Sequence, residues 1–98
     1  MNVKLIKMAS GEDVVAELIR VEGRENVVIN NPIVMVPQRD GQVGFAPWSP
    51  FLSDDVNELT IKASYVVYIS DPKPGVIDNY SQIFSSIITP GQGGIIKP

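Results

Sequence analysis

The chain has 98 residues and a formal net charge of -3, with 44% hydrophobic and 19% charged residues, and it contains neither histidine nor cysteine. This length fits one domain with a thin margin of stability, and this composition excludes a disordered chain. The missing residue types exclude a Ser-His-Asp triad, a Cys-His pair, histidine metal sites and disulfides within one chain.

The same sequence argues for a soluble protein of the cytoplasm. No apolar run approaches the roughly 20 residues that a membrane helix requires. Residues 1–5 lack the basic and apolar regions that begin a signal peptide. We therefore expect a cytoplasmic location and no membrane partner. The net charge of -3 also gives no overall attraction for nucleic acid, so contact with phosphates would depend on a local basic cluster.

The first half of the chain alternates between apolar and polar residues in a way typical of strands. We predict strands over residues 3–8, 13–21 and 26–36, with a turn at 10–12. The third strand is long and is interrupted at residues 30–32, Asn-Asn-Pro. Proline cannot donate a hydrogen bond to a strand ladder, so this interruption indicates a bend or a bulge and a strongly bent sheet.

Further along the chain, residues 43–48 can form another short strand, and residues 59–61 and 65–69 return to a β-type composition. Residues 47–55 mix apolar groups with turn formers. The Pro-Trp-Ser-Pro sequence within them matches the spacing of a polyproline ligand, but such matches are frequent by chance. We therefore predict that Trp48 is packed against the core.

The period changes over residues 74–88, where apolar side chains recur every three or four positions and predict one amphipathic helix. Its apolar side consists of Val76, Ile77, Tyr80, Ile83, Phe84 and Ile87. About five short strands and one terminal helix are most economically arranged as a small, strongly bent, five-stranded antiparallel barrel that the helix partly covers. We predict a single mainly β domain over residues 1–90 and a flexible tail over 91–98.

Catalytic chemistry has one candidate group, which consists of Asp54, Asp55 and Glu58. Carboxylates at this spacing could gather around a hard cation or transfer protons, as in a metal-dependent hydrolase. Acidic residues in such a turn more often cap backbone amides, and the group lacks the glycine and final glutamate of a calcium loop. The glycine-rich residues 91–94 also lack the Lys-Ser/Thr of a phosphate-binding loop. We predict no catalytic residue, no metal, no cofactor and no enzymatic activity.

Two blocks of sequence carry a resemblance to a known family. The first block has a small residue, a leucine, an acid and an asparagine at the family's spacing, at Ala16, Leu18, Glu22 and Asn26. In the second block, residues 61–69 correspond to an isoleucine-arginine-glycine turn that leads into a final strand. The chain thus resembles the Sm-like family of small ring-forming proteins, which includes Sm, LSm and Hfq proteins. Within this family, the chain looks most like the phage-encoded Sm-like proteins as a group.

The resemblance implies an SH3-like, Sm-like barrel and a homo-oligomeric ring of about five to seven subunits. In this family the fourth strand of one subunit pairs with the fifth strand of the next. An open sheet edge is in any case a liability unless another chain pairs with it. We therefore predict the oligomer interface at Tyr65, Val67 and Ile69.

The resemblance also implies a site for single-stranded, uridine-rich RNA. Carried over by position, the family's base-reading role falls on Asn26 and its orienting role on Glu22. Lys62 takes the place of the family's arginine. The family's stacking position falls on Glu25, which has no π-face, so Arg24 is the candidate to stack on a base or to meet phosphate. In the alternative interpretation Asn26 satisfies the backbone of its turn and the two cations are solvated.

A second functional hypothesis comes from a different class. The ring would be a structural or protein-interaction component that binds no RNA. Its partner would dock on the helix or on the apolar loop over residues 47–52.

Overall fold

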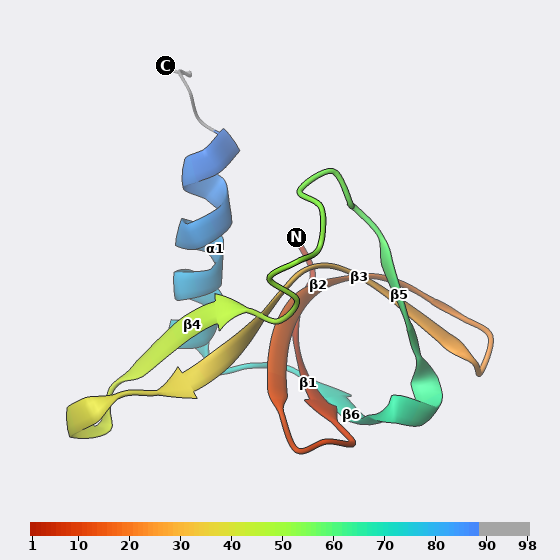
Figure 1. Cartoon of the computed structure of the whole chain (residues 1–98), viewed down its shortest axis with the longest axis horizontal. Coiled ribbons are helices and arrows are strands. Elements are labelled where there is room, and N and C mark those ends of the chain that lie inside the picture. Colours follow the sequence, from red (N-terminus) through yellow and green to blue (C-terminus); the bar gives the residue numbers. More distant parts are fainter. Residues whose placement is uncertain (89–98) are drawn as a thin grey trace.

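The computed structural model describes residues 1–88, with side chains described for residues 1–84. The predicted tail over 91–98 lies outside these residues. The structure is mainly β, with one C-terminal helix as predicted (Figure 1). The strands are β1 (Val3–Met8), β2 (Asp13–Glu22), β3 (Asn26–Pro37), β4 (Val43–Pro47), β5 (Leu59–Lys62) and β6 (Val66–Ser70), and the helix is α1 (Pro74–Ile88).

All strand pairs are antiparallel and belong to one sheet in the order β4-β3-β2-β1-β6, with β5 also paired to β3. The prediction of five strands is wrong, because this sheet has six. The reason is that the last three β-type segments each form a separate strand. The strand β3 has 12 residues. One edge of β3 pairs with β2, and the other edge pairs first with β5 and then with β4.

The sheet curls strongly, so that β1, β2, β3, β5 and β6 surround a common interior, while α1 stands outside it beside β4 (Figure 1). A short 3-10 turn, Ala63–Tyr65, connects β5 to β6. Within residues 1–88 no ladder joins β5 to β6. Closure of the sheet into a barrel therefore stays a prediction.

The change of partner along β3 occurs at an irregularity in its ladder with β2. Val15 lies opposite Ile33, whereas Glu17 lies opposite Asn30. One residue of β2 therefore faces two residues of β3, Asn31 and Pro32, as in a β-bulge. Asn31 has a φ of 51°, in the left-handed region that asparagine tolerates better than most residues. The bend predicted at residues 30–32 is confirmed.

Apolar side chains pack on both sides of the sheet. The inner cluster is built on Ile6, Met8, Val14, Ala16, Val27 and Ile29. The outer cluster lies under the helix and is built on Val3, Val15, Ile33 and Tyr80. Adjacent residues such as Val14 and Val15 point to opposite faces of the strand, so a continuous apolar run in β2 supplies both clusters. Trp48 packs against the inner cluster, as predicted.

Tyr80 joins the helix to the bulge. Its side chain is fully buried, and its ring centroid lies 4.6 Å from that of Phe84, one helical turn further on. The Tyr80 hydroxyl accepts a hydrogen bond from the Glu17 N–H at 3.1 Å. It donates toward the carbonyl oxygens of Asn30 at 3.2 Å and Asn31 at 3.0 Å. One hydroxyl thus gives backbone groups at the bulge a side-chain partner.

In the part of the chain that the structure describes, no helix has the length and apolar character needed to cross a membrane.

Replacing Tyr80 with phenylalanine removes this hydroxyl while keeping the ring. Buried backbone groups around the bulge then lose a partner, so we expect the free energy of unfolding to fall by about 1–3 kcal/mol. Urea unfolding followed by circular dichroism measures this change. The matched control is Tyr68→Phe, because Tyr68 is 45% exposed, and it should change stability by less than about 0.5 kcal/mol. Equal effects of the two variants would contradict the proposed role of the hydroxyl.

Tyr80 should also make the fold sensitive to alkaline pH. Burial is the main cause that raises the pKa of Tyr80 above its ordinary value of 10.0. Above about pH 10 the unfolded chain releases this proton while the folded chain retains it, so stability falls by up to about 1.4 kcal/mol per pH unit. Below that pH the contribution is complete. The free energies of unfolding of the wild type and of Tyr80→Phe should therefore converge as the pH rises. A difference that stays constant with pH would contradict this prediction.

Candidate nucleic-acid interface

Three of the four predicted RNA-binding residues lie side by side on neighbouring strands. Asn26 begins β3, and its Cα partner on one side is Glu22, the last residue of β2. On the other side its Cα partner is Lys62, the last residue of β5. Residues far apart in the sequence therefore meet in one row across three strands, with Asn26 in the centre.

The fourth residue, Arg24, is exposed in the turn between β2 and β3. Gly23 opens this turn with a φ of 61°, a conformation that glycine adopts without a steric cost. The Ala63 N–H donates a hydrogen bond to the Glu25 carbonyl oxygen at 2.7 Å. The turn that carries Arg24 is thus fixed to the 3-10 turn after Lys62, and both cations lie at the same end of the sheet.

The Asn26 side chain has an unusual environment. Its Oδ1 is the single buried side-chain nitrogen or oxygen without a hydrogen-bond partner among the described residues. This oxygen therefore does not satisfy the backbone of the turn. A buried polar atom without a partner carries an energetic cost and calls for an explanation. Because Oδ1 makes no hydrogen bond, rotating the amide toward the surface would break none at this atom.

An ion-pair network occupies the acidic side of the site. Arg20 Nε lies 2.8 Å from Glu22 Oε2, and Arg20 Nη2 lies 3.0 Å from Glu58 Oε1. The hydrogen bond from Arg20 lowers the pKa of Glu58, and the bonds to Glu58 and Glu22 raise the pKa of Arg20. All three side chains are about half exposed, so the network contributes little to stability. One cation faces two carboxylates, so Arg20 offsets part of the charge of Glu22.

Sequence reasoning missed Arg20 and the role of Glu58. Arg20 and Glu22 are two residues apart in one strand and therefore share a face, which is a local signal for the first pair. The pair with Glu58 spans 38 positions and has no local signal.

The predicted interface residues differ in their surroundings. Val67 is 64% exposed and Tyr65 is 43% exposed, whereas Ile69 is half-buried and packs against the inner cluster. Lys7 pairs with Tyr68 and Met8 pairs with Val66, so Val67 has no partner in the β1 ladder. Within residues 1–88, β6 pairs only with β1 and β5 pairs only with β3. Each of these strands therefore keeps one edge without a ladder.

The three acids considered for metal or proton-transfer chemistry do not assemble. Among the described residues no group of three or more acidic side chains is placed to hold a metal ion. Glu58 is directed to Arg20. The Asp55 N–H donates a hydrogen bond to the Ser53 hydroxyl oxygen at 3.3 Å, which is the arrangement of a turn.

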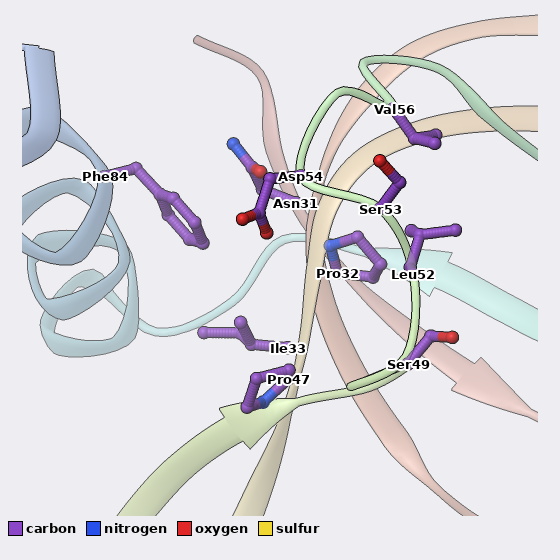
Figure 2. Close-up of a pocket in the computed structure, with 10 residues that line it drawn as sticks. All are labelled: Asn31, Pro32, Ile33, Pro47, Ser49, Leu52, Ser53, Asp54, Val56 and Phe84. Carbon is purple, nitrogen blue, oxygen red and sulfur yellow. The ribbon is translucent and has the colours of Figure 1, made fainter.

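A separate pocket of about 210 Å³ lies where α1, the bulge and the loop after β4 meet (Figure 2). Ile33, Leu52 and Phe84 are among its apolar walls, and Asn31 and Asp54 are among its polar ones. Figure 2 shows the Phe84 ring directed toward these two polar side chains. Among the described residues that line the pocket, Asp54 is the one with a charge.

Comparison with known proteins adds no family: no family model matches the chain, and no curated protein matches it significantly. The resemblance to the Sm-like family stays a prediction that rests on the sequence blocks described above.

Proposed function

We propose that the chain is an Sm-like protein that assembles with copies of itself into a ring and binds single-stranded, uridine-rich RNA beside Asn26. The observation that carries this proposal is the strand register. It aligns Asn26 with Glu22 on one side and with Lys62 on the other. Spacing in the sequence indicated this set of residues, and the ladder is consistent with one shared site.

Two features support assembly. The unpaired edges of β5 and β6 present free backbone donors and acceptors, which another strand can satisfy. Exposed Tyr65 and Val67 lie beside the β6 edge. A contact between the β5 edge of one copy and the β6 edge of the next is heterologous, and such contacts form a ring when the rotation closes.

The charges support an RNA site of modest strength. Arg24 and Lys62 form no ion pair among the described side chains, so both remain free to meet phosphate. Arg20, which Glu22 shares with Glu58, offsets part of the charge of Glu22 and so reduces its repulsion of phosphate. Rotation of the Asn26 amide to the surface would place its donor and acceptor groups against a base edge. Base reading by such an amide is available in single-stranded RNA, whose bases are unstacked and accessible.

One observation favours the second candidate function, a ring that binds another protein. Phe51 is 99% exposed in the loop after β4. Aromatic side chains are enriched at protein interfaces, where a few buried residues carry most of the binding energy.

The assembly proposal predicts that Val67→Lys on the β6 edge weakens the oligomer. The lysine charge would have to lose its hydration shell at the contact. We therefore expect the dissociation constant of the oligomer to rise by about tenfold or more. Light scattering after size-exclusion chromatography, over a range of concentrations, measures this change. The control is Val21→Lys, because Val21 is 55% exposed but lies on β2. A wild-type protein that is monomeric at micromolar concentration would contradict the proposal.

The RNA proposal predicts that an Asn26→Ala/Lys62→Ala variant loses saturable binding to oligo-uridine. We expect the dissociation constant to rise by about tenfold or more. The slope of log affinity against log salt concentration should fall by the amount expected for about one phosphate contact. Fluorescence anisotropy with labelled oligo-uridine and oligo-adenosine, at low and physiological salt, measures both quantities.

The matched control is Lys73→Ala, which removes one positive charge just before α1, away from the site. It should leave binding nearly unchanged. Absence of wild-type binding at either salt concentration would reject the RNA function and favour the protein-binding ring. Equal losses in the control and in the double variant would indicate a general charge effect instead of the proposed site.

A further inference from the structure

The hairpin formed by the end of β3 and the start of β4 projects from the body of the protein (Figure 1). We call residues 36–43 the arm. Every residue of the arm is exposed, and it includes Val36 at 39% and Val43 at 55% exposure. A two-stranded hairpin without a packed face is only marginally stable in water. The arm therefore has apolar surface that the described part of its own chain leaves uncovered.

The backbone of the arm nevertheless has a defined tip. The Gln38 N–H donates to the Gln42 carbonyl oxygen at 2.7 Å. Asp40 and Gly41 both adopt left-handed conformations, with φ values of 62° and 74°. This turn places Arg39 at the end of the arm. None of the ion pairs among the described side chains includes Arg39.

The pocket beside Asp54 has the complementary chemistry. Its volume of about 210 Å³ is below the roughly 300–1,000 Å³ typical of small-molecule sites, so it suits one inserted side chain. Apolar walls such as Ile33 and Leu52 can cover an aliphatic stem. Asp54 can accept hydrogen bonds from a cationic head, and the Phe84 face can pack against it. An arginine side chain combines the required stem and head.

The other cations of the described chain are less suited to this pocket. Three of them already form ion pairs with carboxylates, namely Lys4, Lys7 and Arg20. Arg24 and Lys62 belong to the proposed RNA site, and Lys73 lies in the short link between β6 and α1 and not on a projecting hairpin. Arg39 remains on a projecting element, which is the geometry needed to enter a concave site on another molecule.

Arg39 cannot reach the pocket of its own chain. Pro47, the last residue of β4, lines the pocket, and β4 has five residues. At about 3.4 Å per residue, the start of β4 lies on the order of 14 Å from the pocket, and Arg39 lies beyond it. We propose that Arg39 at the tip of the arm of one copy enters the pocket of a neighbouring copy and pairs there with Asp54.

This contact deepens the proposed assembly and rests on it, because it also joins two different surfaces of identical chains. Such a contact is heterologous and is compatible with a ring. Each copy carries a net charge of -3, so copies repel one another at long range. A local pair of opposite charges offsets part of that repulsion and fixes the orientation of the two copies.

Charge exchange tests the proposal. Arg39→Glu and Asp54→Arg each place like charges together at the contact, so we expect each to raise the dissociation constant of the oligomer by about tenfold or more. The variant with both substitutions restores a pair of opposite charge and should return to within about threefold of the wild type. Light scattering over a concentration series gives these values, and circular dichroism checks that each variant is folded.

The controls change the same charges at other positions. Asp55 is next to Asp54 in the sequence but does not line the pocket, so Asp55→Arg is the first control. Lys73→Glu reverses the charge of an exposed lysine outside the arm. Both should leave the dissociation constant within about threefold of the wild type. The contact is overturned if Asp54→Arg behaves like Asp55→Arg, or if the exchanged pair fails to restore assembly.

The outcomes also separate this contact from the strand-edge contact. If Val67→Lys weakens the oligomer and the charge variants do not, the strand-edge contact is supported and the arm contact is rejected. An oligomer that responds only to the charge variants, and is restored by their combination, supports the arm and rejects the edge. A wild-type monomer rejects both.

Discussion

The arrangement of this protein depends on one hydroxyl group. At the bulge, where β3 changes from β5 to β4 along one edge, the Glu17 N–H and the carbonyl oxygens of Asn30 and Asn31 have a side-chain partner. Tyr80 supplies one acceptor and one donor to these groups. Because Tyr80 belongs to α1, the same contact holds the helix on the outer face of the sheet. The hydrogen bonds of Tyr80 therefore link the bulge, the change of strand partner and the position of the helix.

The helix covers only part of the sheet, and the uncovered parts define where other molecules can bind. The outer cluster under α1 includes residues from β1, β2, β3 and β4, whereas the arm extends past it. The edges of β5 and β6 lie away from α1 (Figure 1). A chain of this size has little core from which to draw stability. Contacts between copies along those edges would add buried area without requiring a longer chain.

Local patterns predicted much of the fold. Alternation located the strands, the three- and four-residue period located α1, and Asn-Asn-Pro located the bulge. The count of five was wrong because the last three β-type segments each form a separate strand. The pairing of β3 with both β4 and β5 along one edge is a long-range choice that no local pattern records. For the same reason the sequence could place Glu22 opposite Asn26 across a short turn, while the alignment of Lys62 with Asn26 came from family resemblance. Tyr80 was recognised as an apolar helix residue, but its hydrogen bonds depend on backbone groups more than 45 positions away.

Charge explains why the two parts of the proposed function belong together. The proposed site and its ion-pair network contain three carboxylates and three cations, so their formal charges sum to zero; these are Glu22, Glu25 and Glu58 with Arg20, Arg24 and Lys62. A single site of this kind attracts phosphate weakly, and the acidic chain as a whole repels it. A ring repeats the site at fixed spacing, and one RNA strand bound at the first copy then meets the next at a high effective concentration. Under the proposed function, weak and nearly neutral sites would bind RNA effectively only after assembly, and the contacts between copies would then be part of the binding mechanism.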